Sequence, residues 1–354
     1  MKLVIDKIIP REICHFADDS LLVTSCANKV FAEHADGREN VSFSVPYPKW
    51  WQRLGALFRL TRRALRLDKM NVAPVAGGFC ILHQGKIWRY DNATRTLTQT
   101  GQLSNCRNVL HQSICVLDGG NTLYFGEYGA NRARAAVPVW HSSDAGKTWT
   151  KIFSFPAKKI KHIHGCFYDP FEDKIWTITG DFENECWLLC SDREFKNLEW
   201  VGTGQQEFRA CNLFFTHDAI HWVMDSQLQD SHHVQLDRKT RTVQEKTAFP
   251  GPGWYHKKLE DGFFLVSTAV EIGPGVHEKN AHVFVTRDFE KWESAAAFPH
   301  DGLPLRYFKF GVIAFADGAQ SSNKFYLFGE ALKGIEGKIA LCHLEPTATG
   351  GGGQ

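Results

Sequence analysis

The sequence predicts an all-β protein built as a seven-bladed β-propeller, with six blades as the alternative count. Strand-like runs separated by turn signals recur throughout the 354 residues, and helical patterning is almost absent. The runs group into units of about 35 to 45 residues with roughly four short strands each, a period typical of propeller blades. The predicted blades cover residues 11–46, 72–103, 113–156, 163–203, 210–250, 253–299 and 308–345.

The ends of the units support the same fold. Four units finish on a similar phrase, FSVP, FSFP, TAFP or AAFP, which places prolines at Pro46, Pro156, Pro250 and Pro299. The last unit lacks a clear outer strand, while KLVIDKII at residues 2–9 belongs to no unit. We expect these two segments to pair, because pairing closes the ring and removes free strand edges. Residues 1–346 are therefore predicted to form one domain, and the glycine-rich tail 347–354 to be disordered.

A turn motif stands between two predicted strands in HSSDAGKTWT, where Ser142, Asp144, Gly146 and Trp149 are spaced Ser-x-Asp-x-Gly-x-x-Trp. The Asp144 carboxylate can accept hydrogen bonds from the backbone N–H groups that follow it, and Gly146 adopts a positive φ without steric cost. The motif is therefore predicted to close a β-hairpin. Weaker copies occur at 286–292 and 191–200.

Residues 48–70 interrupt the blade pattern. Helical spacing relates the following positions within 49–69: Trp51, Leu54, Leu57, Phe58, Thr61, Ala64, Leu65 and Asp68. Five arginines lie among them, with no acidic residue before Asp68: Arg53, Arg59, Arg62, Arg63 and Arg66. This pattern predicts an inserted basic amphipathic helix. It either docks at an anionic membrane surface, where each basic residue contributes about 1 kcal/mol, or packs on the propeller with its arginines in water.

Composition excludes some functions. A net charge of +2 gives no sign of a nucleic-acid-binding surface. Asp6 and Lys7 fall where a signal peptide needs its apolar core, and no window approaches the roughly 18 apolar residues of a membrane span. The ten cysteines are then expected to be reduced thiols of a cytoplasmic protein. With the inserted helix, a peripheral location at the inner face of the membrane is also expected.

Titratable residues recur at two points of successive blades. Predicted first strands begin at His111, His164, Arg209 and His256, and predicted second strands end at Glu127, Asp181, Asp225, Glu271 and Glu330. In a propeller both points lie on one face, around the central channel. Groups of both signs in a shared concavity are expected to shift each other's pKa values and to perform acid–base chemistry. Tyr128 and Tyr255 adjoin two of these positions. A purely structural ring of buried pairs is the alternative.

The segment HIHGCFYDPFEDKIWTITGD contains the most such residues. His162 and His164 are two apart on a predicted strand and therefore share a face, and Asp181 returns to the same opening. One histidine is then a general base, or both hold a divalent metal. No cofactor is expected otherwise.

The turn motif, the blade period and the hairpin YDPFEDKIWTITGD together resemble the sialidase-like, BNR-repeat (Asp-box) β-propellers, which are related to glycosyl hydrolases. The resemblance covers most of the chain and implies that the motif is structural, on a blade rim. Sialidases bind the substrate carboxylate with three arginines, the first in an Arg-Ile-Pro motif. Here the corresponding region reads IIPREICHF, so a sialidase is not expected.

Three functions remain open. The first is an enzyme that makes or breaks glycosidic bonds of an acidic saccharide or glycoconjugate, in glycan assembly or processing, with Asp181, Asp225 and Glu271 as the acids and Arg209 on the anionic sugar. The second is a uronate lyase, a class to which the resemblance assigns a histidine base, a tyrosine acid and a cation. Those roles fit His164, His256, Tyr255 or Tyr128, and Arg209. The third is a propeller that binds saccharides or proteins without catalysis. His111, Glu127, Tyr128, Arg209 and His162 are the expected substrate-binding residues.

Overall fold

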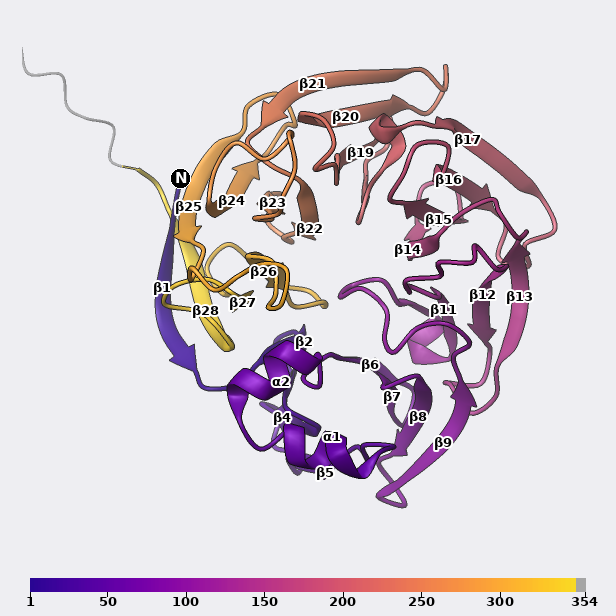
Figure 1. The fold of residues 1–354 in the computed structure, drawn as a ribbon, viewed down its shortest axis with the longest axis vertical. Coiled ribbons are helices and arrows are strands. Elements are labelled where there is room, and N and C mark those ends of the chain that lie inside the picture. The colour runs from indigo at the N-terminus through magenta and orange to yellow at the C-terminus, as the bar shows by residue number, and fades with distance from the viewer. Residues whose placement is uncertain (348–354) are drawn as a thin grey trace, which may run out of the picture.

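The computed structural model describes residues 1–347, which form a ring of β-sheets around a central channel (Figure 1). Within these residues there are seven sheets of four antiparallel strands each. The predicted seven-bladed β-propeller is thereby confirmed. The predicted glycine-rich tail, 347–354, lies outside the described residues apart from Thr347.

Each blade begins with its innermost strand and proceeds outward. Blade 1 has β2 (Ile13–Ala17), β3 (Leu21–Cys26), β4 (Lys29–His34) and β5 (Val41–Ser44). Blade 2 has β6 (Met70–Val75), β7 (Gly78–His83), β8 (Lys86–Asp91) and β9 (Thr96–Gln102). Blade 3 has β10 (Cys115–Leu117), β11 (Thr122–Gly126), β12 (Val137–Ser142) and β13 (Thr150–Phe155), with the 3-10 turn η1 (Asp118–Gly120). Blade 4 has β14 (His162–Asp169), β15 (Lys174–Gly180), β16 (Cys186–Ser191) and β17 (Leu198–Gly204).

Blade 5 follows the 3-10 turn η2 (Gln206–Phe208) and has β18 (Phe214–Phe215), β19 (Ala219–Val223), β20 (Ser231–Asp237) and β21 (Val243–Phe249). Blade 6 has β22 (Gly253–Lys258), β23 (Phe264–Thr268), β24 (Asn280–Thr286) and β25 (Glu293–Pro299). Blade 7 has β26 (Val312–Phe315), β27 (Phe325–Glu330), β28 (Lys338–Glu345) and, as its outer strand, β1 (Lys2–Ile9). The predicted pairing of the N-terminal segment with the last blade is confirmed by the antiparallel register of β1 on β28.

Apolar side chains between neighbouring blades form the core. Ile163 of β14 is fully buried and packs with Val137 and Val139 of the preceding blade. The blades approach so closely that a Cβ at Gly126 would lie 2.2 Å from the Ile163 side chain, which requires glycine there. Close packing of this kind fixes each inner strand relative to the channel, and so it positions the polar side chains at the strand ends.

The predicted hairpin turn between β12 and β13 is observed. Asp144 accepts hydrogen bonds from the Thr148 backbone N–H at 2.9 Å, the Thr148 hydroxyl at 2.7 Å and the Ser142 hydroxyl at 2.8 Å, and Gly146 has φ +80°. All these contacts are local. The motif therefore stabilises a turn between strands of blade 3 and contributes nothing to the channel.

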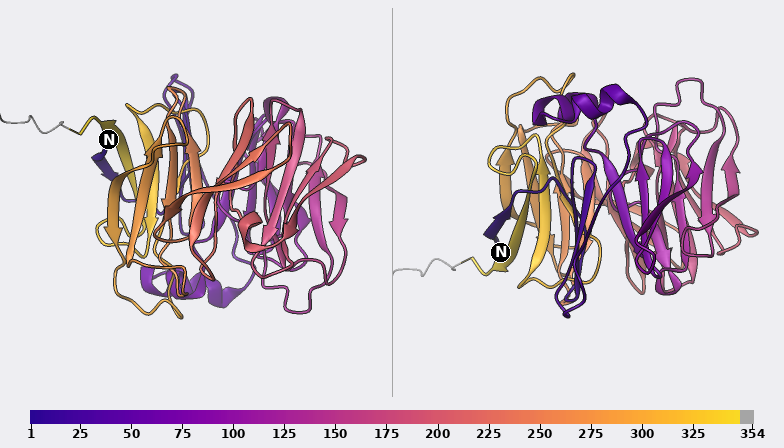
Figure 2. Two further views of the ribbon diagram at one scale, coloured as in Figure 1. Left: turned by 90° about the horizontal axis from the view of Figure 1, so that it is seen from above. Right: turned by 90° about the horizontal axis from the view of Figure 1, so that it is seen from below.

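The inserted segment differs from its prediction in two respects. First, it forms two short helices, α1 (Trp50–Gly55) and α2 (Arg59–Leu65), rather than one continuous helix. They join β5 to β6 and lie on the face of the disc where the inner strands begin (Figure 2). We call residues 49–66 the cap.

Second, the arginines of α2 form ion pairs with carboxylates of the propeller instead of extending into water. Arg59 pairs with Asp68 at 2.5 Å and with Glu12 at 3.1 Å, and Arg63, 3% exposed, pairs with Asp301. The apolar residues of the predicted buried face are instead exposed, among them Leu57 at 68% and Phe58 at 69%. The carboxylates that pair with the arginines lie far away in sequence. Helical spacing alone therefore predicts that the apolar face is buried and the basic face exposed, whereas the structure shows the opposite. No helix of residues 1–347 has the length and apolar character that crossing a membrane requires.

Candidate functional site

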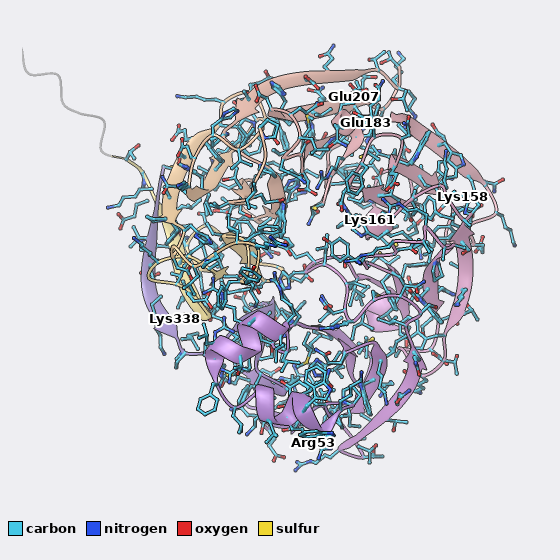
Figure 3. All side chains as sticks on the ribbon, in the orientation of Figure 1. Arg53, Lys158, Lys161, Glu183, Glu207 and Lys338 are labelled. Atoms are coloured by element: carbon cyan, nitrogen blue, oxygen red, sulfur yellow. The ribbon has the colours of Figure 1, made fainter. Side chains whose placement is uncertain are left out.

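A cavity of about 770 Å³ opens in the centre of the ring, on the face that bears the cap. Residues of blades 1, 2, 3, 4, 6 and 7 line it. Its wall contains five cationic side chains and one carboxylate: Arg66, Lys69, Arg107, Lys161, Lys309 and Glu330. Figure 3 shows Lys161 close to the centre of the ring and Arg53 on the cap. Aromatic rings of Tyr128, Trp254, Tyr255 and Phe310 complete the wall.

The one carboxylate of this wall is already paired. Lys69 Nζ lies 2.6 and 2.8 Å from the two oxygens of Glu330, and Lys309 Nζ lies 3.3 Å from one of them. Burial would raise the pKa of Glu330, but the two lysines outweigh it and lower that pKa, so the group is ionised. Because Lys309 also binds the buried Asp68 at 2.5 Å, charges under the cap are linked to the channel wall. The remaining cations favour an anionic ligand.

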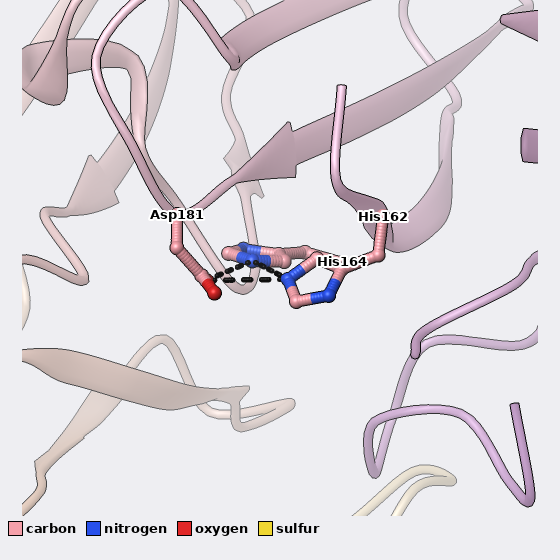
Figure 4. Close-up of side chains that lie close together, drawn as sticks. All are labelled: His162, His164 and Asp181. Carbon is pink, nitrogen blue, oxygen red and sulfur yellow. Dashed lines mark hydrogen bonds and ion pairs between the residues drawn. The ribbon is translucent and has the colours of Figure 1, made fainter. Parts of the chain in front are cut away.

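At one side of the cavity, His162, His164 and Asp181 converge (Figure 4). The two Nε2 atoms are 3.2 Å apart, and each lies 3.2 Å from Asp181 Oδ1. The histidines are two residues apart on β14, and Asp181 follows the end of β15 next to Gly180, which pairs with His162. Strand register therefore explains the cluster, as predicted for this segment.

The opposite ring nitrogens fix the tautomers of both histidines. His162 Nδ1 lies 2.8 Å from the Gly129 carbonyl oxygen, and His164 Nδ1 lies 2.6 Å from that of Ala210. A carbonyl only accepts, so each Nδ1 carries the proton and donates it, which leaves the lone pair on Nε2. Burial lowers the pKa of His162, which favours its neutral form. Two nitrogen lone pairs and one carboxylate oxygen thus face each other.

Cations surround the carboxylate of this cluster. Lys161 forms an ion pair with Asp181 Oδ2, and Arg209 Nη2 lies 3.4 Å from Oδ1. Burial alone would raise the pKa of Asp181, but the neighbouring His162 and His164 outweigh it and lower that pKa. Asp181 therefore remains ionised at neutral pH.

Arg209 connects this cluster to a second carboxylate. Its Nε donates to Asp225 Oδ2 at 3.2 Å, and the Cys211 thiol donates to the same oxygen at 3.2 Å. Nearby, burial and the charge of Asp225 raise the pKa of Glu271 to about 8, so Glu271 is mostly protonated at neutral pH. Glu271 and Asp181 are thus in opposite protonation states at neutral pH.

The structure brings together part of the predicted ring. His164 with Asp181, and Arg209 with Asp225, are paired as the blade alignment predicts, and Tyr128 packs on His162 with ring centroids 4.1 Å apart. These residues surround one side of the channel: His162, His164, Asp181, Arg209, Asp225 and Tyr128. His111 and Tyr255 line the same cavity, with their ring centroids 5.8 Å apart.

Two predicted residues lie elsewhere. Glu127 accepts hydrogen bonds from the backbone N–H groups of Ser104 and Asn105 and from Trp140 Nε1, so it holds a loop. His256 is buried and stacks on Phe214 with centroids 4.7 Å apart, and it is not part of the cavity wall. Within residues 1–347 no hydrogen bond or ion pair joins either residue to its expected blade partner, because each is engaged by a neighbour distant in sequence.

Several residues of the wall carry little functional signal in the sequence. Lys161 directly precedes His162, so its position beside the two histidines was the available signal. Lys69 lies in the inserted segment and Lys309 lies just before the first strand of blade 7, and nothing in the blade pattern indicates that they meet at Glu330. Cys211 follows the predicted site residue Arg209 by two positions on the same connection, and this closeness in sequence is its only signal.

The sequence matches no protein-family model, and no curated protein matches it. Solved structures do match. One is the extracellular domain of a putative hybrid two-component system of B. thetaiotaomicron, with a TM-score of 0.55 and 13% identity over 98% of this chain. This chain spans 38% of that one.

Two others cover most of both chains. An oligogalacturonate lyase in complex with manganese has a TM-score of 0.55 and 10% identity, over 94% of this chain and 88% of its own. A chain of the mitotic checkpoint complex has a TM-score of 0.55 and 8% identity, over 97% of this chain and 95% of its own. These proteins are as different as a putative two-component system, a lyase and a mitotic checkpoint complex. At such identities these matches therefore establish the propeller fold alone.

Proposed function

We propose that this protein binds an acidic saccharide in the central cavity and cleaves it there by β-elimination at a uronate residue. The observation that carries this proposal is the composition of the cavity wall: five cations, two histidines and two tyrosines beside one carboxylate that is already paired. Hydrolysis needs two carboxyl groups at the scissile bond. Elimination needs a base, an acid and cations that neutralise the substrate carboxylate.

His111 supplies the base. Its Nε2 lies 2.7 Å from the Phe315 carbonyl oxygen and donates to it, which leaves the lone pair on Nδ1. Burial lowers the pKa of His111 to about 4, so the imidazole is neutral and able to accept a proton at pH 7. Tyr255, beside it, supplies the acid, because burial raises its pKa well above the usual value and keeps the phenol protonated.

His111 removes the proton at C5 of the uronate, whose carboxylate is held by the cations of the cavity wall. The C5–H electron pair forms the C4–C5 double bond while the C4–O bond breaks, and the leaving oxygen takes the Tyr255 proton. That an oligogalacturonate lyase shares the fold is consistent with this chemistry.

The test is incubation with oligosaccharides of uronic acids, followed by ultraviolet absorbance for the unsaturated product. The wild type is expected to form it, and His111→Gln to lower its rate by about 10²- to 10⁴-fold, the usual contribution of a general base, with saccharide binding retained. His256→Gln, a histidine outside the cavity, is the matched control. Saccharide binding without any product would identify a binding protein instead and overturn the proposed reaction.

The contrast between Glu271 and Asp181 favours a second candidate, hydrolysis or transfer at a glycosidic bond. A protonated carboxyl group near an ionised one is the pairing that glycosidases use, and the pKa of Glu271 is raised to about 8 while that of Asp181 is lowered. Glycosidic products without ultraviolet absorbance, formed by the wild type and lost in Glu271→Gln, would select this candidate.

A further inference from the structure

We propose that His162, His164 and Asp181 form a binding site for a divalent transition-metal ion. Their three facing atoms lie at 3.2 Å from one another, an equilateral arrangement. Ligand atoms bound at about 2.0 to 2.2 Å to one metal ion, on one face of its coordination sphere, are themselves separated by about 3.0 to 3.5 Å. The side chains are therefore already at the spacing that a shared ion requires.

The hydrogen bonds of the two histidines also favour a bound cation. Both Nδ1 atoms donate to backbone carbonyls, of Gly129 and Ala210, so both Nε2 atoms present lone pairs toward Asp181 Oδ1. A single proton between the three atoms satisfies two of them, whereas a cation at their centre satisfies all three. Backbone contacts to the outer nitrogen are also how proteins orient histidine ligands.

The ligand types select the class of metal. Two imidazoles and one carboxylate suit zinc, manganese, iron or nickel, whereas magnesium and calcium prefer oxygen ligands alone. Three protein ligands leave further coordination positions, and His162 lines the cavity, so those positions open toward it. An ion there would bind the carboxylate of the proposed substrate, but metal binding itself does not depend on that function.

The test is calorimetric titration of chelator-treated protein with Zn²⁺ and, separately, Mn²⁺. We expect one ion per chain, at least 100-fold weaker binding in His164→Ala and in Asp181→Asn, and unchanged binding in His111→Gln, which removes the proposed base. The melting temperature of the wild type is expected to rise with metal, because the ion binds only the folded state. Asp181→Asn is nearly isosteric and guards against loss of fold.

Absence of one-site binding by either ion, or equal affinities in wild type and both ligand variants, would show a hydrogen-bonded cluster only and overturn the metal site. A metal site without saccharide turnover would leave this inference standing and refute the proposed reaction. Turnover that chelation leaves unchanged, in a protein that binds no metal, would refute the metal site and leave the proposed reaction standing.

An independent observation supports a second inference: we infer that the cap docks on an anionic lipid bilayer. Its outer surface is apolar and aromatic, with Trp50 73%, Leu57 68% and Phe58 69% exposed. Tyr307, 65% exposed, extends this surface, since the adjoining Phe308 carbonyl accepts a hydrogen bond from Arg66 of the cap. A concentrated apolar patch of this kind marks an interaction surface.

Charge identifies a bilayer as the occupant. Segments 49–67 and 302–310 contain no acidic residue, and Lys49, Arg53 and Arg306 are exposed. None of these three cations forms a salt bridge within residues 1–347. Tryptophan and tyrosine beside uncompensated cations match the interfacial layer of a membrane with anionic headgroups. The arginines of α2 serve a different purpose, since they anchor the cap to the propeller.

The test is co-sedimentation with vesicles of phosphatidylcholine alone or mixed with phosphatidylglycerol. Wild type is expected to bind the mixed vesicles, and the double variant Trp50→Ala, Phe58→Ala to bind them at least 10-fold more weakly. Lys49→Gln with Arg53→Gln should reduce binding to the anionic vesicles only. Phe171→Ala, an exposed aromatic on the β14–β15 turn at the opposite face, is the matched control.

Two outcomes would overturn the docking surface. One is wild-type binding that the double variant retains in full, or no wild-type binding to either vesicle. The other is concentration-dependent dimerisation, measured by analytical ultracentrifugation and abolished by Trp50→Ala with Phe58→Ala, which would make the cap an interface between two copies of this chain.

Discussion

Replacement of Lys309 by methionine tests the charge network that connects the cap to the channel. Lys309 is 1% exposed and pairs with Asp68 at 2.5 Å and Glu330 at 3.3 Å. Removing one partner of a buried pair costs about 3 to 5 kcal/mol, since the other charge stays buried. We expect the lower end, about 3 kcal/mol, because Asp68 keeps Arg59 and Glu330 keeps Lys69.

This loss translates into a measurable temperature shift. Unfolding entropy of about 2.1 cal/mol/K per residue gives about 0.7 kcal/mol/K for 354 residues, so 3 kcal/mol lowers Tm by about 4 °C. Circular dichroism during thermal and urea unfolding measures both quantities. Lys291→Met is the matched control, because that side chain is 80% exposed and should change the unfolding free energy by less than about 0.5 kcal/mol.

A double-mutant cycle separates the ion pair from lost packing. If the charges interact, Lys309→Met combined with Asp68→Asn should cost at least about 1 kcal/mol less than the sum of the single changes. A single variant within 0.5 kcal/mol of wild type, or strictly additive effects, would show that Lys309 is not held by these carboxylates and would refute the reasoning.

Three further predictions concern stability. Asp144→Ala should lower the unfolding free energy by about 1 to 2 kcal/mol through lost turn hydrogen bonds, with activity per folded molecule unchanged in saccharide assays. Because the pKa of Glu271 is raised to about 8 in the folded state, that state binds the extra proton, and the unfolding free energy should fall by up to about 1.4 kcal/mol per pH unit as pH rises from about 4.5 to 8. Urea unfolding across this range should show a slope that Glu271→Gln removes. Arg59→Gln with Arg63→Gln should destabilise the protein by several kcal/mol, and unchanged Tm would contradict the inward placement of α2.

The blades were predictable because a propeller repeats local signals. Each blade needs four short strands and tight turns, and these appear directly in the sequence as apolar runs, prolines and turns such as the one at Asp144. The same repetition placed His164 beside Asp181 and Arg209 beside Asp225, since equal positions in neighbouring blades reach the same face. The local sequence pattern and the symmetry of the ring were therefore sufficient to predict these two pairs of the site.

Contacts between distant segments decided the rest. Glu127 is held by the backbone at Ser104 and Asn105, and His256 by the ring of Phe214, so neither reaches the cavity despite equivalent positions in the repeat. Helical spacing in the cap identified an apolar face and a basic face, but not which of them packs on the propeller. Orientation depends on carboxylates such as Glu12 and Asp301, which are distant from the cap in sequence and lie beside it in the folded ring.

The cap and the cavity share one face of the disc, and Arg66 belongs to both, since it ends α2 and lines the cavity. A bilayer bound by Trp50 and Phe58 would therefore lie beside the cavity mouth, where the acidic saccharide of the proposed function would also bind. The two surfaces use different side chains, however, so their effects should be separable. His111→Gln is expected to keep vesicle binding, and the Trp50→Ala, Phe58→Ala variant to keep turnover of soluble saccharides. Loss of both properties in either variant would mean that the cap controls the cavity directly, through the ion pairs that join Lys309 to Asp68.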